Sequence, residues 1–133
     1  MPSDGEVLMI IERRKFLIAL GGSIIASAAQ AQGDDLGFEW RVHEEVPGGR
    51  FWEGTWRRRG RSDVFDARWR DSQSGGIVLD VIEIQSYDGS SITLYRRGNN
   101  GTYSGVVSHP GRSIRGTASW YPAGAFWTAQ IRG

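Results

Sequence analysis

The tryptophans are the residues of this chain best suited to hold a small molecule, and there are six of them in 133 residues. Indole rings bury a large apolar area and pack well against other rings. They therefore predict either a filled interior or a ring-lined pocket at one mouth of the fold, and the sequence leaves both interpretations open. The candidates for such a pocket, all expected to point inward, are Trp52, Trp56, Trp69, Trp120, Trp127 and Tyr103.

Asp80 and Arg96 are the polar residues most clearly placed among these rings. Asp80 is the one charged residue on an apolar face of segment 77–86, and Arg96 falls on the facing set of segment 91–97. An inward acid opposite an inward arginine predicts an ion pair that either plugs the mouth or anchors a ligand at the rim of the pocket. A bulge at Val81-Ile82 is the competing register, because it would turn Asp80 outward.

Residues that could catalyse a reaction are few. The sequence has no cysteine, which excludes disulfides, thiolate nucleophiles, zinc fingers and iron–sulfur clusters. Its histidines, His43 and His109, are expected in a solvated loop and an exposed turn, and His43-Glu44-Glu45 lacks a second histidine at metal-binding spacing. No Gly-x-Ser-x-Gly motif marks a serine nucleophile. We therefore predict that the protein is not an enzyme and uses no metal or cofactor.

A group of arginines could bind an anion such as phosphate, a lipid head group or single-stranded nucleic acid. Its members are Arg57, Arg58, Arg59, Arg61, Arg68 and Arg70. The formal charge is only +1, so acids neutralise most of the field. We favour a solvated outer face with cross-strand ion pairs, such as Glu53 with Arg68, and predict no nucleic-acid partner.

The elements that must position these residues are strands. After residue 33, apolar and polar residues alternate with period two, which is typical of antiparallel sheets with one buried face. The predicted strands lie near 38–43, 51–58, 63–70, 77–86, 91–97, 101–108, 113–121 and 125–132. We expect an all-β, up-and-down meander of about eight strands that closes into a small barrel, since closure removes exposed edges. A two-sheet sandwich is the alternative.

The turns between these segments predict which residues lie opposite one another, because loop length determines the register of a hairpin. Phe38, Trp40 and Val42 should point inward on the first strand. The predicted opposite pairs are Trp56 with Phe65, Ile84 with Ile92, Leu94 with Gly105, Gly105 with Gly116, and Trp120 with Trp127.

Residues 1–31 are typical of an export signal. Arg13-Arg14-Lys15 precedes a mostly apolar stretch that is too short for a permanent membrane anchor, and Ala29-Gln30-Ala31 predicts cleavage before Gln32. The paired arginines before Phe16-Leu17 favour the twin-arginine route over ordinary secretion. We expect a periplasmic or secreted protein whose partners include the export machinery, with a leader over 32–50 that contains the first strand and a barrel domain over 51–133.

Two resemblances support this interpretation. Gly54-Thr55-Trp56 is similar to the Gly-x-Trp signature of the lipocalin and avidin barrels, although the later Thr-Asp-Tyr motif of lipocalins is absent. Residues 51–131 resemble small exported bacterial proteins of unknown function, through Trp52 to Trp56, Phe65 to Trp69 and Gly116 to Trp120. These resemblances imply a barrel and export, and they imply no activity.

The sequence therefore predicts an exported β-barrel that binds a small apolar or ring-bearing ligand. The alternative is a structural or interaction protein of the cell envelope, an inhibitor or assembly factor, with a filled core.

Overall fold

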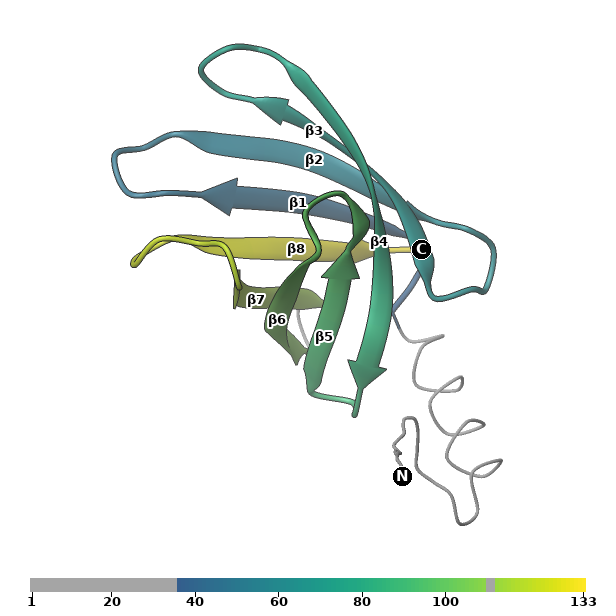
Figure 1. The fold of residues 1–133 in the computed structure, drawn as a ribbon. Helices are drawn as coiled ribbons and strands as arrows, with labels where there is room; N and C mark the ends of the chain where they lie inside the picture. Colours follow the sequence, from purple (N-terminus) through teal and green to yellow (C-terminus); the bar gives the residue numbers. More distant parts are fainter. Residues whose placement is uncertain (1–35, 110–111) are drawn as a thin grey trace. The chain divides into compact units, whose positions relative to one another are not determined.

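Eight antiparallel strands close into a barrel in which each strand pairs with its neighbours in sequence and β1 also pairs with β8 (Figure 1). The computed structural model describes residues 36–109 and 112–133. The strands are β1 (Glu39–Glu45), β2 (Phe51–Arg58), β3 (Val64–Asp71), β4 (Ile77–Tyr87), β5 (Ser91–Arg96), β6 (Gly101–Ser108), β7 (Ser113–Ala118) and β8 (Phe126–Arg132). The predicted all-β meander and its closure are confirmed, and the sandwich alternative is wrong. The export signal predicted over residues 1–31 lies outside the described residues.

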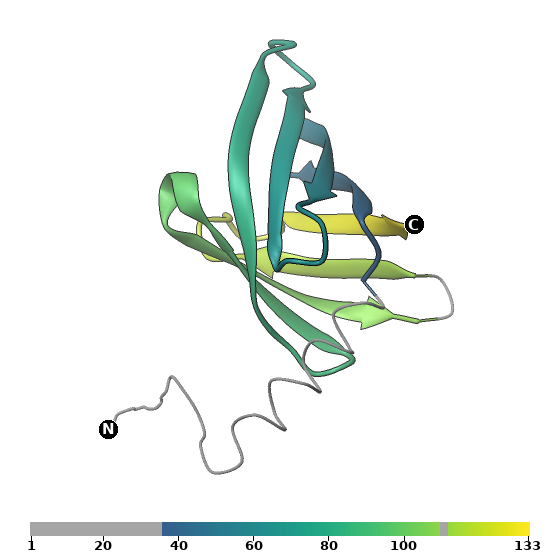
Figure 2. The ribbon, with the colours of Figure 1, turned by 90° about the vertical axis from the view of Figure 1, so that its right-hand side faces the viewer.

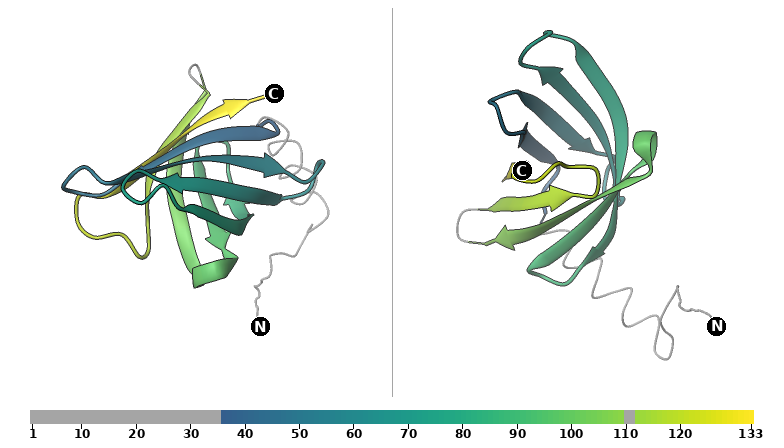
Figure 3. Two further views of the ribbon diagram at one scale, coloured as in Figure 1. Left: turned by 90° about the horizontal axis from the view of Figure 1, so that it is seen from above. Right: turned by 60° about the vertical axis from the view of Figure 1, so that its left-hand side comes forward.

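The long strand β4 joins the two sides of the barrel. It pairs with β3 through its first half and with β5 through its second half, and Figure 2 shows it running along one side of the barrel. The right-hand view of Figure 3 shows the strands surrounding a common interior. No helix long and apolar enough to cross a membrane occurs among the residues described by the structure.

The sequence predicts the inward faces better than the exact partners. Gly105 lies opposite Gly116, as predicted, because the turn between β6 and β7 has the expected length. Trp56, however, lies opposite Ala67 instead of Phe65, because the β2–β3 loop spans residues 59–63 and is closed by a hydrogen bond from Ser62 N to Arg59 O (3.0 Å). The slip is by an even number of residues, so every inward side chain still faces inward.

Two other predicted pairs are also wrong, those of Leu94 with Gly105 and of Trp120 with Trp127. Leu94 lies opposite Tyr103, because the 3-10 turn Arg97–Asn99 and the left-handed Asn100 (φ 54°) lengthen the β5–β6 connection. Trp120 has no strand partner, because β7 already ends at Ala118.

The β4–β5 hairpin contains the bulge of the sheet, although not where the sequence analysis considered one. The register shifts between Ile84 and Ser86, so Ile84 lies opposite Leu94 and Tyr87 opposite Ile92. The predicted pair of Ile84 with Ile92 is therefore wrong. Residues around Val81-Ile82 pair regularly with β3. Because the bulge comes after Asp80 along β4, it does not turn this residue outward, and Asp80 stays on the inner side of the strand opposite Ala67.

The middle of the barrel is filled by rings around Trp56. This indole packs against Trp40 (centroids 5.7 Å apart), Trp127 (6.0 Å) and Tyr103 (5.2 Å), and all four side chains are fully buried. Room for them comes from small residues such as Gly105 and Gly116, whose backbones approach so closely that a Cβ on Gly116 would lie 1.8 Å from the Ser104 carbonyl oxygen.

One end of the barrel is sealed by the segment before β1. Trp40 donates its Nε1 hydrogen to the Leu36 carbonyl (2.6 Å), and Arg58 donates to the Gly37 carbonyl (3.1 Å). Arg58 is buried, which corrects the expectation that it lies on the solvated outer face, because it follows Trp56 at period two. Phe38 is 41% exposed instead of inward, because the chain turns at Gly37 (φ 66°) just before β1.

Candidate functional site

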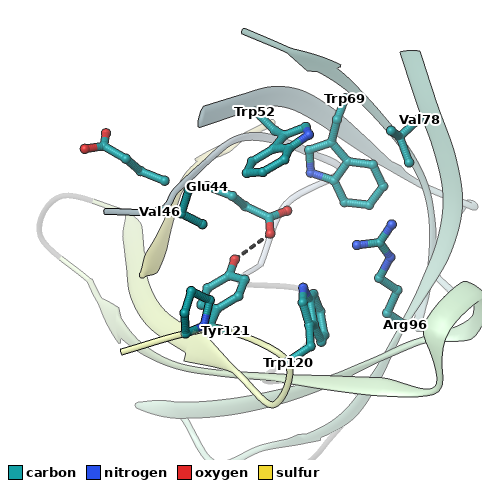
Figure 4. Close-up of a pocket in the computed structure, with 10 residues that line it drawn as sticks. Glu44, Val46, Trp52, Trp69, Val78, Arg96, Trp120 and Tyr121 are labelled. Carbon is teal, nitrogen blue, oxygen red and sulfur yellow. Dashed lines mark hydrogen bonds between the residues drawn. The ribbon is translucent and has the colours of Figure 1, made fainter. Parts of the chain in front are cut away.

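The opposite end of the barrel is hollow. A cavity of about 250 Å³ opens between the β1–β2 loop, the β7–β8 loop and strands β3 to β5 (Figure 4). Its lining residues are Glu44, Glu45, Val46, Trp52, Trp69, Val78, Arg96, Trp120, Tyr121 and Pro122. The interior is therefore filled at its centre and hollow at this end, so each of the two sequence-based interpretations describes one part of the barrel.

Three tryptophans form the walls of this cavity. Trp69 is buried on β3 over Gly54, Trp52 is half-buried at the start of β2, and Trp120 is 36% exposed in the β7–β8 loop. The other predicted pocket residues do not line it. Trp56 and Trp127 lie in the filled core, while Tyr103 and Asp80 stand behind the lining and contact residues that belong to it.

Arg96 carries the positive charge of the cavity. Its Nε donates to Asp80 Oδ2 (2.7 Å), and its guanidinium carbon lies 4.7 Å from the Trp69 ring centre and 5.5 Å from that of Trp120. The predicted pair is present, although Arg96 lies opposite Ile82 in the register and reaches Asp80 diagonally. Cation–π contacts of this kind hold a guanidinium between two rings.

Asp80 is ionised at neutral pH. Burial alone would raise the pKa of its carboxyl group, but hydrogen bonds from Arg96 and from the N–H groups of Val81 (2.7 Å) and Gly98 (2.9 Å) lower that pKa below its usual value. The charges of Asp80 and Arg96 therefore compensate each other inside the barrel.

Glu44 lines the cavity, although the sequence did not single it out as a pocket residue. It is 7% exposed, and its carboxylate accepts hydrogen bonds from the Tyr103 hydroxyl (2.8 Å) and the Tyr121 hydroxyl (2.5 Å). Burial raises its pKa above the usual value. Burial and the charge of Glu44 also raise the pKa of both tyrosines, so they remain donors. Its inward position could have been predicted from the sequence, because Glu44 follows the inward residues Trp40 and Val42 at period two.

A buried donor next to Glu44 has no partner. The indole nitrogen of Trp69 meets the distance and angle of a hydrogen bond with no acceptor among the described residues, although its N–H faces the Glu44 carboxylate and lowers that group's pKa. Figure 4 shows this nitrogen on the side of the ring that faces Glu44. The indole nitrogen of Trp56 also lacks a partner in this part of the chain, but it is enclosed by rings of the core.

Neither histidine lines the cavity. His43 lies on β1 and makes hydrogen bonds with Glu53 (2.5 Å) and Glu45 (2.9 Å). Partial burial alone would lower the pKa of His43, but the interactions with these two acids outweigh it, so the pKa is raised overall. The predicted pair of Glu53 with Arg68 is wrong, because Glu53 lies opposite Arg70 and bonds His43 instead. Across residues 36–109 and 112–133, no group of three acidic, histidine or cysteine side chains is placed to hold a metal ion.

Two arginines of the outer face pair with acids of the same face, while Arg70 donates to the Gly75 carbonyl (3.2 Å). Arg57 lies 3.3 Å from Glu39, and Arg59 lies 2.8 Å from Asp66. Exposed pairs of this kind contribute about 0–1 kcal/mol each to stability.

Comparison with known proteins shows the fold and no family. No protein-family model matches the chain, and no curated protein matches it significantly. The solved structure of EF1p2_mFAP2b bound to DFHBI is similar, with a TM-score of 0.51 and 14% identity over 78% of this chain and 99% of that one. A redesigned beta barrel, b11L5F_LGL, has a TM-score of 0.49 and 14% identity over 77% of this chain and 96% of that chain. The chain is thus similar to small β-barrels.

Proposed function

We propose that the protein is a binding module that holds one small, ring-bearing ligand in the cavity at the hollow end. The observation that carries this proposal is the wall of three indoles, Trp52, Trp69 and Trp120, around a space that a filled core would not leave. About 250 Å³ is smaller than a typical drug-sized pocket and suits a molecule of one or two rings. The similar barrel solved with DFHBI is consistent with a small molecule in this fold.

Binding without catalysis is part of the proposal. Among the described residues that line the cavity there is no serine, threonine, cysteine, histidine or lysine to act as a nucleophile. Both oxygens of Glu44 already accept hydrogen bonds from tyrosines, which favours a role in positioning over proton transfer.

Isothermal titration calorimetry with naphthalene-2-carboxamide tests this function. We expect saturable binding to one site on the wild-type protein and at least tenfold weaker binding to Trp52→Ala, because one wall of the cavity is lost. Leu79→Ala is the control, since Leu79 is 71% exposed on the outer face of β4 and should leave the affinity unchanged. Equal affinity in Trp52→Ala and the wild type would contradict the proposed site.

We also propose that the module acts outside the cytoplasm. The support is the basic, apolar and small-residue pattern of residues 1–31, with Arg13-Arg14 favouring the twin-arginine route. Mass spectrometry of the exported protein should find Gln32 at the amino terminus. A product that keeps residues 1–31 would overturn this part of the proposal.

A further inference from the structure

The charged groups around the cavity already have partners. The positive charge of Arg96 is matched by Asp80 at 2.7 Å, and the Glu44 carboxylate accepts two tyrosine O–H donors. Glu45, the remaining charged lining residue, bonds His43 (2.9 Å). An added anion would face Glu44 and Asp80, whereas an added cation would face Arg96. Either ion would lose its water shell in this space, where the carboxylates and the guanidinium already have hydrogen-bond partners.

The hydrogen-bonding groups of the cavity are not fully used. Trp69 is 2% exposed, and its N–H faces the Glu44 carboxylate without a hydrogen bond of regular geometry to it or to any other described residue. A buried donor without a partner is costly, so an acceptor placed beside it stabilises the complex. The Glu44 carboxylate has about four lone-pair positions and uses two of them on Tyr103 and Tyr121, so it can accept one more donor.

Because Trp69 and Glu44 are neighbours, one small group can serve both. We propose that the cavity is built for a ligand whose ring system carries an uncharged group with a hydrogen-bond donor beside an acceptor, as in a primary amide or a lactam. The acceptor would take the N–H of Trp69, the donor would bond Glu44, and the rings would lie among Trp52, Trp120 and Val78. This inference rests on the proposed function, since it names the ligand class of the same site.

Four ligands with one ring system and different polar groups test this inference by calorimetry at pH 7. They are naphthalene-2-carboxamide, methyl 2-naphthoate, 2-naphthoate and 2-naphthylmethylammonium. We expect the carboxamide to bind about tenfold more tightly than the ester, which lacks the donor for Glu44, and at least tenfold more tightly than either ion.

Variants of two tryptophans test the contact itself. Trp69→Phe keeps an aromatic ring and removes the unpartnered N–H, so it should weaken carboxamide binding about tenfold. Trp127→Phe is the matched control, because its N–H bonds the Thr117 carbonyl (2.9 Å) and it does not line the cavity, so the affinity should not change. Circular dichroism in the near ultraviolet establishes that both variants are folded.

The outcomes separate this inference from the proposed function. Tightest binding of 2-naphthoate would indicate an anion site at Arg96, tightest binding of the ammonium would indicate a cation site at Glu44, and equal binding of all four would show that the polar group is not recognised. Each result overturns the inference and leaves a binding module. Absence of binding by all four ligands overturns both.

Discussion

The filled middle of the barrel and its hollow end each contain three of the six tryptophans, and they use them differently. In the middle, Trp40 and Trp127 donate to backbone carbonyls, and both rings stack on Trp56, with centroids 5.7 and 6.0 Å from it. At the hollow end, the indoles of Trp52, Trp69 and Trp120 surround a space that also holds Arg96 and Glu44 (Figure 4).

The difference teaches that the neighbours of an indole decide its role. Trp56 lies opposite Ala67, and such small residues let rings meet at the centre. At the hollow end, Arg96 lies between the rings of Trp69 and Trp120, and Glu44 stands beside Trp69, so polar groups take the place that rings occupy in the core. Burying polar groups of this kind lowers the stability of a core, whereas in a binding site the same groups can orient a ligand.

The largest expected effect is on stability at the centre. Trp56→Ala should lower the free energy of unfolding by about 3–5 kcal/mol, because it removes the ring on which the core packs and leaves a void. Trp120→Ala, at a residue that is 36% exposed, should cost about 1 kcal/mol or less. Urea unfolding of both variants measures this contrast. Similar losses would mean that the two regions do not differ.

The ion pair of the hollow end should have the next largest effect. Arg96→Leu should cost about 2–3 kcal/mol, because it leaves the mostly buried Asp80 charge without its partner, and Asp80→Asn in the same chain should recover part of that loss. A double-mutant cycle by urea unfolding measures the coupling. A coupling energy near zero would show that the pair does not hold this end together.

Gly116 tests how closely the filled region is packed. Gly116→Ala should cost about 1–3 kcal/mol, since the new Cβ would lie 1.8 Å from the Ser104 carbonyl oxygen and the backbone must move. Gly76→Ala is the control: its Cβ would meet only the Ser74 hydroxyl at 3.1 Å, and a small shift of that side chain accommodates it. Equal denaturant midpoints for the two variants would contradict this packing.

The smallest effect is a pH dependence at the hollow end. Burial raises the pKa of Glu44 in the folded protein, so its contribution to stability is present below its unfolded pKa and is lost as the pH rises through the folded pKa. The stability of the wild type relative to Glu44→Gln should therefore fall as the pH rises from the unfolded pKa of a glutamate, about 4.3, through the folded pKa, by about 1.4 kcal/mol for each unit of pKa shift. The other titratable groups around Glu44 are present in both proteins, so their effects cancel in this comparison. These groups are Asp80, Arg96, Glu45, Tyr103 and Tyr121. A difference that is constant or rises with pH would contradict the assignment.

Period-two alternation was sufficient to predict the barrel and its inward face, because register slips by an even number of residues do not change which side chains face inward. Loop length could not be predicted in the same way. The turns at residues 59–63 and Arg97–Asn99 contain more residues than the short turns that were predicted from the Gly and Asn residues within them.

The polar part of the site was harder to predict. Glu44 stands in the polar run His43-Glu44-Glu45, which is typical of a loop, and its partners Tyr103 and Tyr121 lie 59 and 77 residues away along the chain. They meet only because β1 closes the barrel against β8. Asp80 and Arg96 could be predicted, because both stand out as single charges on apolar faces of neighbouring strands.

The most direct test of the difference between the two regions is a proton–nitrogen correlation spectrum of the six indole N–H groups, recorded during titration with naphthalene-2-carboxamide. The signals of Trp52, Trp69 and Trp120 should shift until one site is saturated, with Trp69 shifting most because its N–H gains an acceptor. Those of Trp40, Trp56 and Trp127 should stay nearly constant, because these indoles do not line the cavity. Equal shifts in both groups, or none in the first, would contradict a ligand site at the hollow end.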